Sequence, residues 1–151
     1  MKTILQTQRD FESRVGEALF ESQPVIIDSD RIQAYCKSLD QLDWFHFDED
    51  QCHEAGLTNI IAPGSLTFAL VHSTFFQHIE LIDLKALFVG SDRFRVVRPV
   101  TANDLVTLRM AIATVESRQE GFRVAYKFEW QGANEADPIS NGIFLVRYWP
   151  S

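Results

Sequence analysis

The chain has 151 residues, of which 46% are hydrophobic, and it carries a formal net charge of −7 with a pI near 5. A chain of this length and composition can bury a sizeable core, so we expect one globular domain over residues 1–151. The acidic balance argues against a general nucleic-acid binder, which needs a basic face, although it leaves room for a local basic pocket that holds an anionic ligand.

The cysteines and the N-terminal segment favour a cytoplasmic protein. Cys36 and Cys52 are the only cysteines, and neither belongs to a spacing typical of zinc sites or of a disulfide framework. Residues 1–14 lack the apolar core of a signal peptide. We therefore expect a cytoplasmic protein that uses neither a metal nor a cofactor and that binds neither nucleic acid nor a membrane.

The first half of the chain predicts mainly helices. Residues 9–19 place apolar side chains at every fourth position and predict a short helix, and residues 24–27 predict a short strand. Asp28 or Ser29 is expected to cap an amphipathic helix that ends near Leu39. The apolar face of that helix would contain Ile32, Tyr35, Cys36 and Leu39.

A long apolar run over residues 66–79 predicts a buried helix around which the rest of the chain packs. The run is too short, and too often broken by polar residues, to span a membrane. Before it, Pro63 and Gly64 indicate a turn, and Ser65 is the expected N-cap of the helix. Residues 40–48 concentrate aromatic and titratable side chains just ahead of this turn, so the free N–H groups of the helix N-terminus would lie near titratable groups.

The second half predicts strands. Residues 122–130 alternate strictly between large apolar and polar side chains and give the strongest strand signal in the chain. Residues 86–100 alternate in part, residues 104–116 place their apolar side chains on one face, and residues 139–148 form a last strand after a loop at 132–138. Long strands joined by short turns predict an antiparallel sheet, and helices followed by such strands predict an α+β fold.

Three motifs follow one another along the chain in an informative order. The first is residues 40–48, DQLDWFHFD, in which an aspartate precedes a His-x-Asp. The second is residues 61–70, IAPGSLTFAL, and the third is residues 90–100, GSDRFRVVRPV, followed by Asp104. Together they resemble the MaoC-like dehydratases, a family that includes the (R)-specific enoyl-CoA hydratases and the nodulation-protein-N-like branch. The resemblance implies the hot-dog fold, in which a curved antiparallel sheet wraps a long central helix.

The chain departs from the family pattern at two positions. The family places its catalytic aspartate five residues before the histidine, and this position is Gln41 here. Asp40 lies one residue further back and Asp43 lies closer to His46, so Asp40 is the first candidate for the catalytic carboxylate and Asp43 the second. The family histidine before the helix glycine is replaced by Pro63, which lacks both a polar side chain and a backbone donor.

The resemblance implies reversible addition of water to a 2-enoyl thioester of coenzyme A or of an acyl carrier. A carboxylate and a histidine that share one water can supply the base and the acid of this reaction. The implied catalytic residues are Asp40 or Asp43 and His46. A backbone N–H at the helix N-terminus can stabilise the developing enolate oxygen. The implied substrate-binding residues are Gly64 and Ser65, together with Arg93, Arg95 and Arg98 for the phosphates.

Simpler interpretations compete with each of these roles. A histidine among aromatic side chains is more often a packed residue than a catalyst. Asp40, which follows a helix, and the acidic run 48–50, which begins another turn, can serve as capping groups. Arginines spaced along a strand, like the three in residues 90–100, more often form its solvent-exposed face than a phosphate-binding site. Two other functions also stay open: a catalytically weakened hot-dog protein that binds acyl thioesters or partners, and a thioesterase. Hot-dog subunits typically join their sheets, so the resemblance further implies a homodimer.

Overall fold

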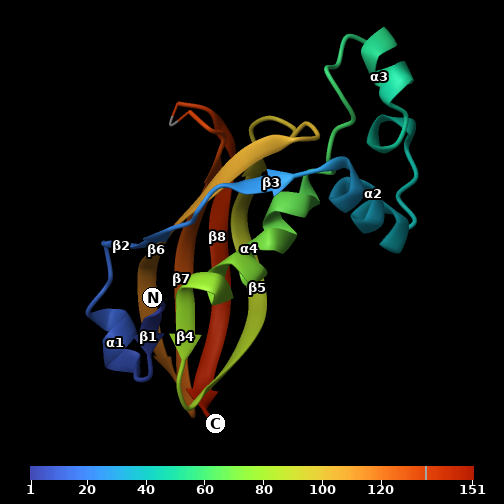
Figure 1. Cartoon of the computed structure of the whole chain (residues 1–151). Coiled ribbons are helices and arrows are strands. Elements are labelled where there is room, and N and C mark those ends of the chain that lie inside the picture. Colours follow the sequence, from blue (N-terminus) through green and yellow to red (C-terminus); the bar gives the residue numbers. More distant parts are fainter. Residues whose placement is uncertain (135) are drawn as a thin grey trace.

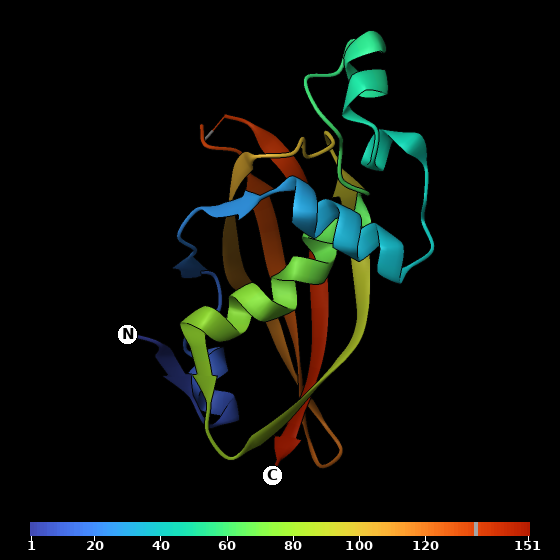
Figure 2. The ribbon, with the colours of Figure 1, turned by 45° about the vertical axis from the view of Figure 1, so that its right-hand side comes forward.

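The helix α4 lies across the concave face of a strongly curved antiparallel sheet (Figures 1 and 2). The structure is a computed structural model of the chain, and it describes residues 1–134 and 136–151. In chain order the elements are β1 (Thr3–Leu5), α1 (Gln8–Glu12), β2 (Ala18–Glu21), β3 (Val25–Ile27), α2 (Ser29–Ser38), the 3₁₀ turn η1 (Trp44–His46), α3 (Glu49–Glu54), α4 (Ser65–His78), β4 (Ile79–Leu81), β5 (Leu84–Val96), β6 (Asp104–Arg118), β7 (Gly121–Gln131) and β8 (Pro138–Pro150). The predicted α+β architecture, a long helix wrapped by an antiparallel sheet, is confirmed.

The sheet has the strand order β2–β6–β7–β8–β5, and β3 pairs with β6 beyond the end of β2. All of these pairings are antiparallel, because hairpins join β6 to β7 and β7 to β8. A separate parallel pair, β1 with β4, lies beside the main sheet. The loop predicted at 132–138 shortens to 132–137, and Glu135 within it lies outside the described residues.

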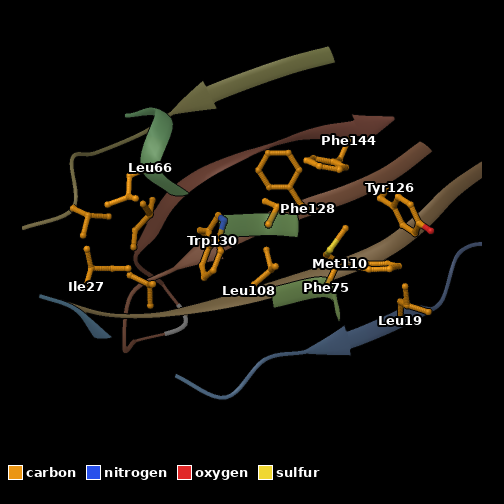
Figure 3. Close-up of a cluster of buried hydrophobic side chains, with 14 of the residues drawn as sticks. Leu19, Ile27, Leu66, Phe75, Leu108, Met110, Tyr126, Phe128, Trp130 and Phe144 are labelled. Atoms are coloured by element: carbon orange, nitrogen blue, oxygen red, sulfur yellow. The ribbon is translucent and has the colours of Figure 1, made fainter. Parts of the chain in front are cut away.

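Side-chain alternation in β7 builds one wall of the core, as predicted. The large apolar residues of this strand are all buried, and they face α4 together with residues of β6 and β8 (Figure 3). The inward-facing residues of β7 are Phe122, Val124, Tyr126, Phe128 and Trp130. Burial of such a large aromatic surface is the main favourable term in the stability of the fold.

The predicted helix over residues 9–19 is wrong in its second half. A capping box between Thr7 and Asp10 starts α1, but the helix ends at Glu12. Gly16 then adopts a φ of +85°, which reverses the chain, and β2 pairs with β6. Leu19 and Phe20 gain more by packing as a strand on β6 than by extending a marginal helix, so tertiary pairing overrides the local pattern.

The strand β5 is the exposed edge of the sheet. It pairs with β8 along one side, and among the described residues no strand pairs with its other side. Leu87, Phe88 and Val89 each leave between 44% and 55% of their surface exposed. A long edge strand with exposed apolar side chains is a place where another chain can pair.

Candidate active site

His46 lies in the segment between α2 and α4 and is buried, with 2% of its surface exposed. The 3₁₀ turn η1 ends at this residue, and the backbone of Ile61 holds the turn from the other side. The Ile61 N–H donates to the Phe45 carbonyl at 2.9 Å, and the His46 Nδ1 lies 2.5 Å from the Ile61 carbonyl. Because a carbonyl can only accept, Nδ1 carries the proton, and Nε2 of the neutral ring is left with a lone pair.

The side chain that faces this lone pair belongs to Gln41. Its Nε2 lies 3.5 Å from the His46 Nε2, which makes a long hydrogen bond in which the amide donates. An amide can orient a water molecule or a substrate but cannot exchange a proton at ordinary pH. The position that the family resemblance assigns to the catalytic aspartate therefore lies beside His46, and it holds an amide.

Asp40 lies at the end of α2 as a capping residue. Its φ is +54°, its N–H donates to the Lys37 carbonyl at 3.2 Å, and the Gln41 N–H donates to the Cys36 carbonyl at 2.9 Å. These two bonds define a Schellman motif, in which the left-handed residue is usually glycine. The side chain of Asp40 is exposed, and the same turn directs Gln41 toward His46.

Asp43 is also exposed, and it precedes η1 as its N-cap without a side-chain capping bond. Its negative charge contributes to the raised pKa of the Cys36 thiol, although burial of the sulfur is the larger cause. The Asp43 backbone carbonyl accepts from the His46 N–H at 3.1 Å. Among the described residues, neither the Asp40 nor the Asp43 carboxylate has a recorded hydrogen bond with the His46 imidazole, whose recorded side-chain neighbour is Gln41.

The N-terminus of α4 follows directly after Ile61, which brings it close to His46. Gly64 is the N-cap residue, and Ser65 is the first helical residue, so the prediction that Ser65 caps the helix is wrong. The reason is that the Pro63 carbonyl already accepts from the Leu66 N–H, which starts the helix one residue earlier. Within the described part of the chain, no acceptor is recorded for the Gly64 or Ser65 N–H, as is usual for a first helical turn.

Two contacts shape the surroundings of these N–H groups. A Cβ at position 64 would lie 2.9 Å from the Val96 side chain, so glycine lets β5 approach the helix end. The Ser65 hydroxyl lies 2.9 Å from the Tyr35 hydroxyl, which joins α4 to α2. Gly64 is exposed, and its N–H therefore lies at a surface that a substrate can reach.

The three arginines have different positions. Arg93 and Arg95 are exposed on β5, where Arg93 has a φ of +55° inside a bulge against β8. Arg98 instead forms ion pairs with Asp137 at 2.6 Å and with Asp104 at 3.0 Å. The hydrogen bonds that Arg98 donates to Asp137 are the main cause of the raised pKa of Arg98, and they lower the pKa of the Asp137 carboxyl. Arg98 thus ties the chain just after β5 to the start of β6 and to the loop before β8.

The segment around His46 is acidic. Residues 38–84 contain no lysine or arginine, and they include an exposed acidic run of which Asp48 caps α3. The cations that flank this stretch in sequence are Lys37, at the end of α2, and Lys85, on β5. Among the described residues, no group of three or more His, Cys, Asp or Glu side chains is placed to hold a metal ion. None of the described helices has the length and apolar character needed to cross a membrane.

A second feature, which sequence reasoning missed, lies between the middle of α4 and the sheet. Here an apolar hollow of about 30 Å³ is bordered by a pair of buried tyrosines, Tyr126 and Tyr148, whose hydroxyls are 2.5 Å apart. Burial raises the pKa of both phenols. The alternation of β7 and β8 placed both rings on the buried face, but only the strand register brings their hydroxyls together.

The curved sheet, its central helix and the His46 segment define a dehydratase-type domain. The chain belongs to the FAS1-like dehydratase domain region family, whose family model matches residues 13–134. It is 30% identical over 99 residues to a UPF0336 protein of Mycolicibacterium paratuberculosis, and the match covers 62% of this chain and 58% of that protein.

Solved structures with the same fold confirm the hot-dog architecture. A monoamine oxidase regulatory protein from Archaeoglobus fulgidus superposes with a TM-score of 0.77 at 18% identity, covering 93% of this chain and 94% of that one. The R-hydratase PhaJ1 of Pseudomonas aeruginosa has a TM-score of 0.74 at 16% identity, covering 91% and 83%. The HadBC (3R-hydroxyacyl-ACP dehydratase) complex of Mycobacterium tuberculosis gives 0.69 at 18%, covering 85% and 94%. At these identities the likeness shows the fold.

Proposed function

We propose that this chain is a hydratase or dehydratase domain that acts on a 2-enoyl thioester, with His46 as its acid–base group. The observation that carries the proposal is the orientation of the imidazole. Its Nδ1 is bound to the carbonyl of Ile61, which lies three residues before Gly64, so its Nε2 lone pair is available close along the chain to the free N–H of Gly64. Water addition to a thioester requires a base and an oxyanion donor in one site.

The proposed reaction needs one proton carrier. His46 Nε2 takes a proton from water as the water oxygen bonds to the β-carbon, and the electron pair of the double bond moves onto the thioester oxygen as an enolate. The Gly64 N–H, assisted by the dipole of α4, donates to that oxygen. The imidazolium then returns the proton to the α-carbon as the carbonyl re-forms. Gln41 orients the water. Asp40 and Asp43 are given no proton-transfer step, because both side chains are exposed and the described residues record no hydrogen bond between either carboxylate and the imidazole.

We propose that β5 binds the coenzyme A or acyl-carrier portion of the substrate. The phosphates of coenzyme A or of a carrier-bound phosphopantetheine would meet Arg93 and Arg95, which are exposed close along the chain to Val96, the neighbour of Gly64. Arg98 supports this strand through its ion pairs instead of contacting the ligand.

A second candidate function is a subunit that binds acyl thioesters without turning them over. Gln41 favours it, because an amide beside His46 leaves the site without the paired carboxylate that the family resemblance implies. In this case the domain would hold the substrate for a partner chain.

We further propose that the chain assembles with a second copy through the open edge of β5. Its exposed apolar residues and unpaired backbone groups suit extension of the sheet, and a structural relative is described as a complex, HadBC. The molar mass in solution, measured by light scattering, tests this. A monomer at micromolar concentration would contradict it.

The decisive experiment compares the wild-type chain with Gln41→Asp, using butenoyl-CoA as substrate. We expect slow hydration by the wild type and a rate roughly 10²-fold higher in Gln41→Asp, because a carboxylate beside His46 adds a second acid–base group. Gln51→Asp is the matched control, since it adds the same charge on the exposed surface of α3.

The remaining outcomes separate the candidates. Binding of the thioester without turnover in wild type, with turnover gained in Gln41→Asp, would favour the binding subunit. Release of free thiol would indicate a thioesterase. Equal rates in Gln41→Asp and Gln51→Asp would show that position 41 does not face the reacting water. Loss of the wild-type rate in Asp40→Asn or Asp43→Asn would return the catalytic role to that carboxylate.

A further inference from the structure

One stripe of α4 leads from the proposed oxyanion donor into the molecule. Gly64, Phe68, Val71 and Phe75 recur at spacings of four, three and four residues, which places them on the same face of an α-helix. This face looks toward β5 and β8, because Gly64 approaches Val96 of β5 and Phe68 contacts rings on both strands. An acyl chain whose thioester oxygen is held at Gly64 and which enters the domain would follow this stripe.

Phe68 closes the stripe one helical turn beyond Gly64. Its ring centroid lies 5.1 to 5.9 Å from the centroids of four other phenylalanine rings. These rings are Phe88 and Phe94 of β5, Phe128 of β7 and Phe144 of β8. Four residues of helix advance by about 6 Å, so this aromatic cluster leaves room for only a short acyl chain behind Gly64.

Beyond the cluster lies the apolar hollow between α4 and the sheet. Val71 and Phe75 border it from α4, and two rings of the Phe68 cluster, Phe88 and Phe144, border it from the sheet. Figure 3 shows Phe144 and Tyr126 on the inner side of the sheet along this part of the core. The hollow measures about 30 Å³. Phe68 packs on Phe88 and Phe144 and lies between Gly64 and Val71 along the helix, so its ring stands between the hollow and the end of the helix at Gly64.

We propose that Phe68 is the residue that sets the acyl-chain length: it ends the slot after a short chain and separates the slot from the hollow. The inference rests on the proposed function, since it takes Gly64 as the point where the thioester is held. Removing the ring would join the slot to the hollow and give a longer chain an apolar lining formed by Val71, Phe75, Phe88 and Phe144.

The test measures binding of two unreactive saturated thioesters, butyryl-CoA and octanoyl-CoA, by calorimetry. We expect the wild type to bind octanoyl-CoA no more tightly than butyryl-CoA. Phe68→Ala should shift the ratio of the two dissociation constants toward octanoyl-CoA by about tenfold or more, because each methylene that finds an apolar site contributes. Phe68→Leu, which keeps more of the packing, should shift it in the same direction by less.

Phe76→Ala is the matched control. Phe76 is a half-buried ring on the same helix that borders the same hollow from its far side, two turns beyond Phe68. Thermal unfolding of each variant checks that the fold is kept. An unchanged ratio in both Phe68 variants, or an equal shift in Phe76→Ala, would overturn the inference while leaving the proposed function intact. Failure of every variant to bind either thioester would overturn the proposed function and the inference with it.

Discussion

The two ends of α4 are built in different ways. At the N-terminal end, polar groups meet backbone groups: His46 bonds to the Ile61 carbonyl, Gln41 faces the ring, and Ser65 meets Tyr35 at an exposed position. At the C-terminal end, aromatic rings pack on one another. The contacts there include Phe75 with Tyr126, and Phe20 stacked on His78 at 4.6 Å.

The difference shows which end can do chemistry. The N-terminal end has free N–H groups, an imidazole lone pair and a neighbouring exposed surface. From its middle to its C-terminal end the helix packs mainly against aromatic side chains, and the buried Tyr126–Tyr148 hydroxyl pair beside it is satisfied internally. A hydrogen-bonded polar segment at one end and a packed core at the other is a common division between site and scaffold.

The largest expected effect is on catalysis at the N-terminal end. His46→Ala should lower the rate of enoyl-thioester hydration by about 10²–10⁴-fold, because it removes the only proposed proton carrier. His46→Asn keeps a donor for the Ile61 carbonyl and should lose the same activity with less loss of stability. The control is His53→Ala, an exposed histidine bonded to the Thr58 carbonyl, which should retain the wild-type rate. If both His46 variants kept the wild-type rate, the active site would not lie at this end of α4.

The next effect concerns stability at the C-terminal end. Tyr126→Phe should lower the free energy of unfolding by about 1–3 kcal/mol, because it leaves the buried Tyr148 hydroxyl without its recorded partner. Tyr35→Phe removes a hydroxyl of similar chemistry at the exposed end, where water replaces it, and should cost less than about 0.5 kcal/mol. Urea denaturation measures both variants. If both variants lost the same free energy of unfolding, the two ends would not differ in how strongly a lost hydroxyl destabilises them.

A smaller, stabilising effect is expected at the end of α2. Asp40→Gly should raise the free energy of unfolding by about 1 kcal/mol or less, because glycine adopts the φ of +54° at this position without steric cost. Asp43→Gly is the control, since its φ of −60° gives glycine no such advantage. If Asp40→Gly instead abolished turnover, Asp40 would be the catalytic carboxylate and its capping role would be secondary.

The smallest effect is a pH dependence at the loops that Arg98 joins. Its hydrogen bonds lower the pKa of Asp137 in the folded state below the ordinary value of 3.8, so the pair stabilises the fold above about pH 4. This stability is lost as the pH falls through the folded pKa. Because Asp137 is partly exposed, the contribution should not exceed about 1 kcal/mol.

Asp137→Asn should therefore lower stability at pH 7 by this amount and flatten the dependence of unfolding on pH between 5 and 2. Denaturation curves recorded across that range measure the slope. Glu129→Gln provides a comparison, because its contact with Lys127 spans 3.9 Å between exposed side chains and should leave the slope nearly unchanged. A wild-type slope in Asp137→Asn would show that the Arg98 pair adds nothing to stability.

The sequence by itself determined the elements whose burial pattern is local. Period-two alternation over residues 122–130 was sufficient to define β7 and its buried face, and the apolar run after Gly64 was sufficient to define α4. Short signals likewise predicted a strand at 24–27, observed as 25–27, and a helix cap at Asp28 or Ser29, of which the structure shows Asp28. The sequence predicts these elements correctly because their secondary structure depends only on neighbouring residues and on the burial of one face.

Only the tertiary structure decided what lies beside His46. The spacing of Asp40, Gln41 and Asp43 left the choice open, since it does not say which side chain a turn directs inward. The left-handed conformation of Asp40 and the two bonds of the Schellman motif settle the direction: they leave Asp40 exposed and bring Gln41 to the imidazole. In the same way, only the tertiary structure decided the role of Arg98, because its ion pair with Asp137, 39 residues away, forms only where the fold brings the two charges together.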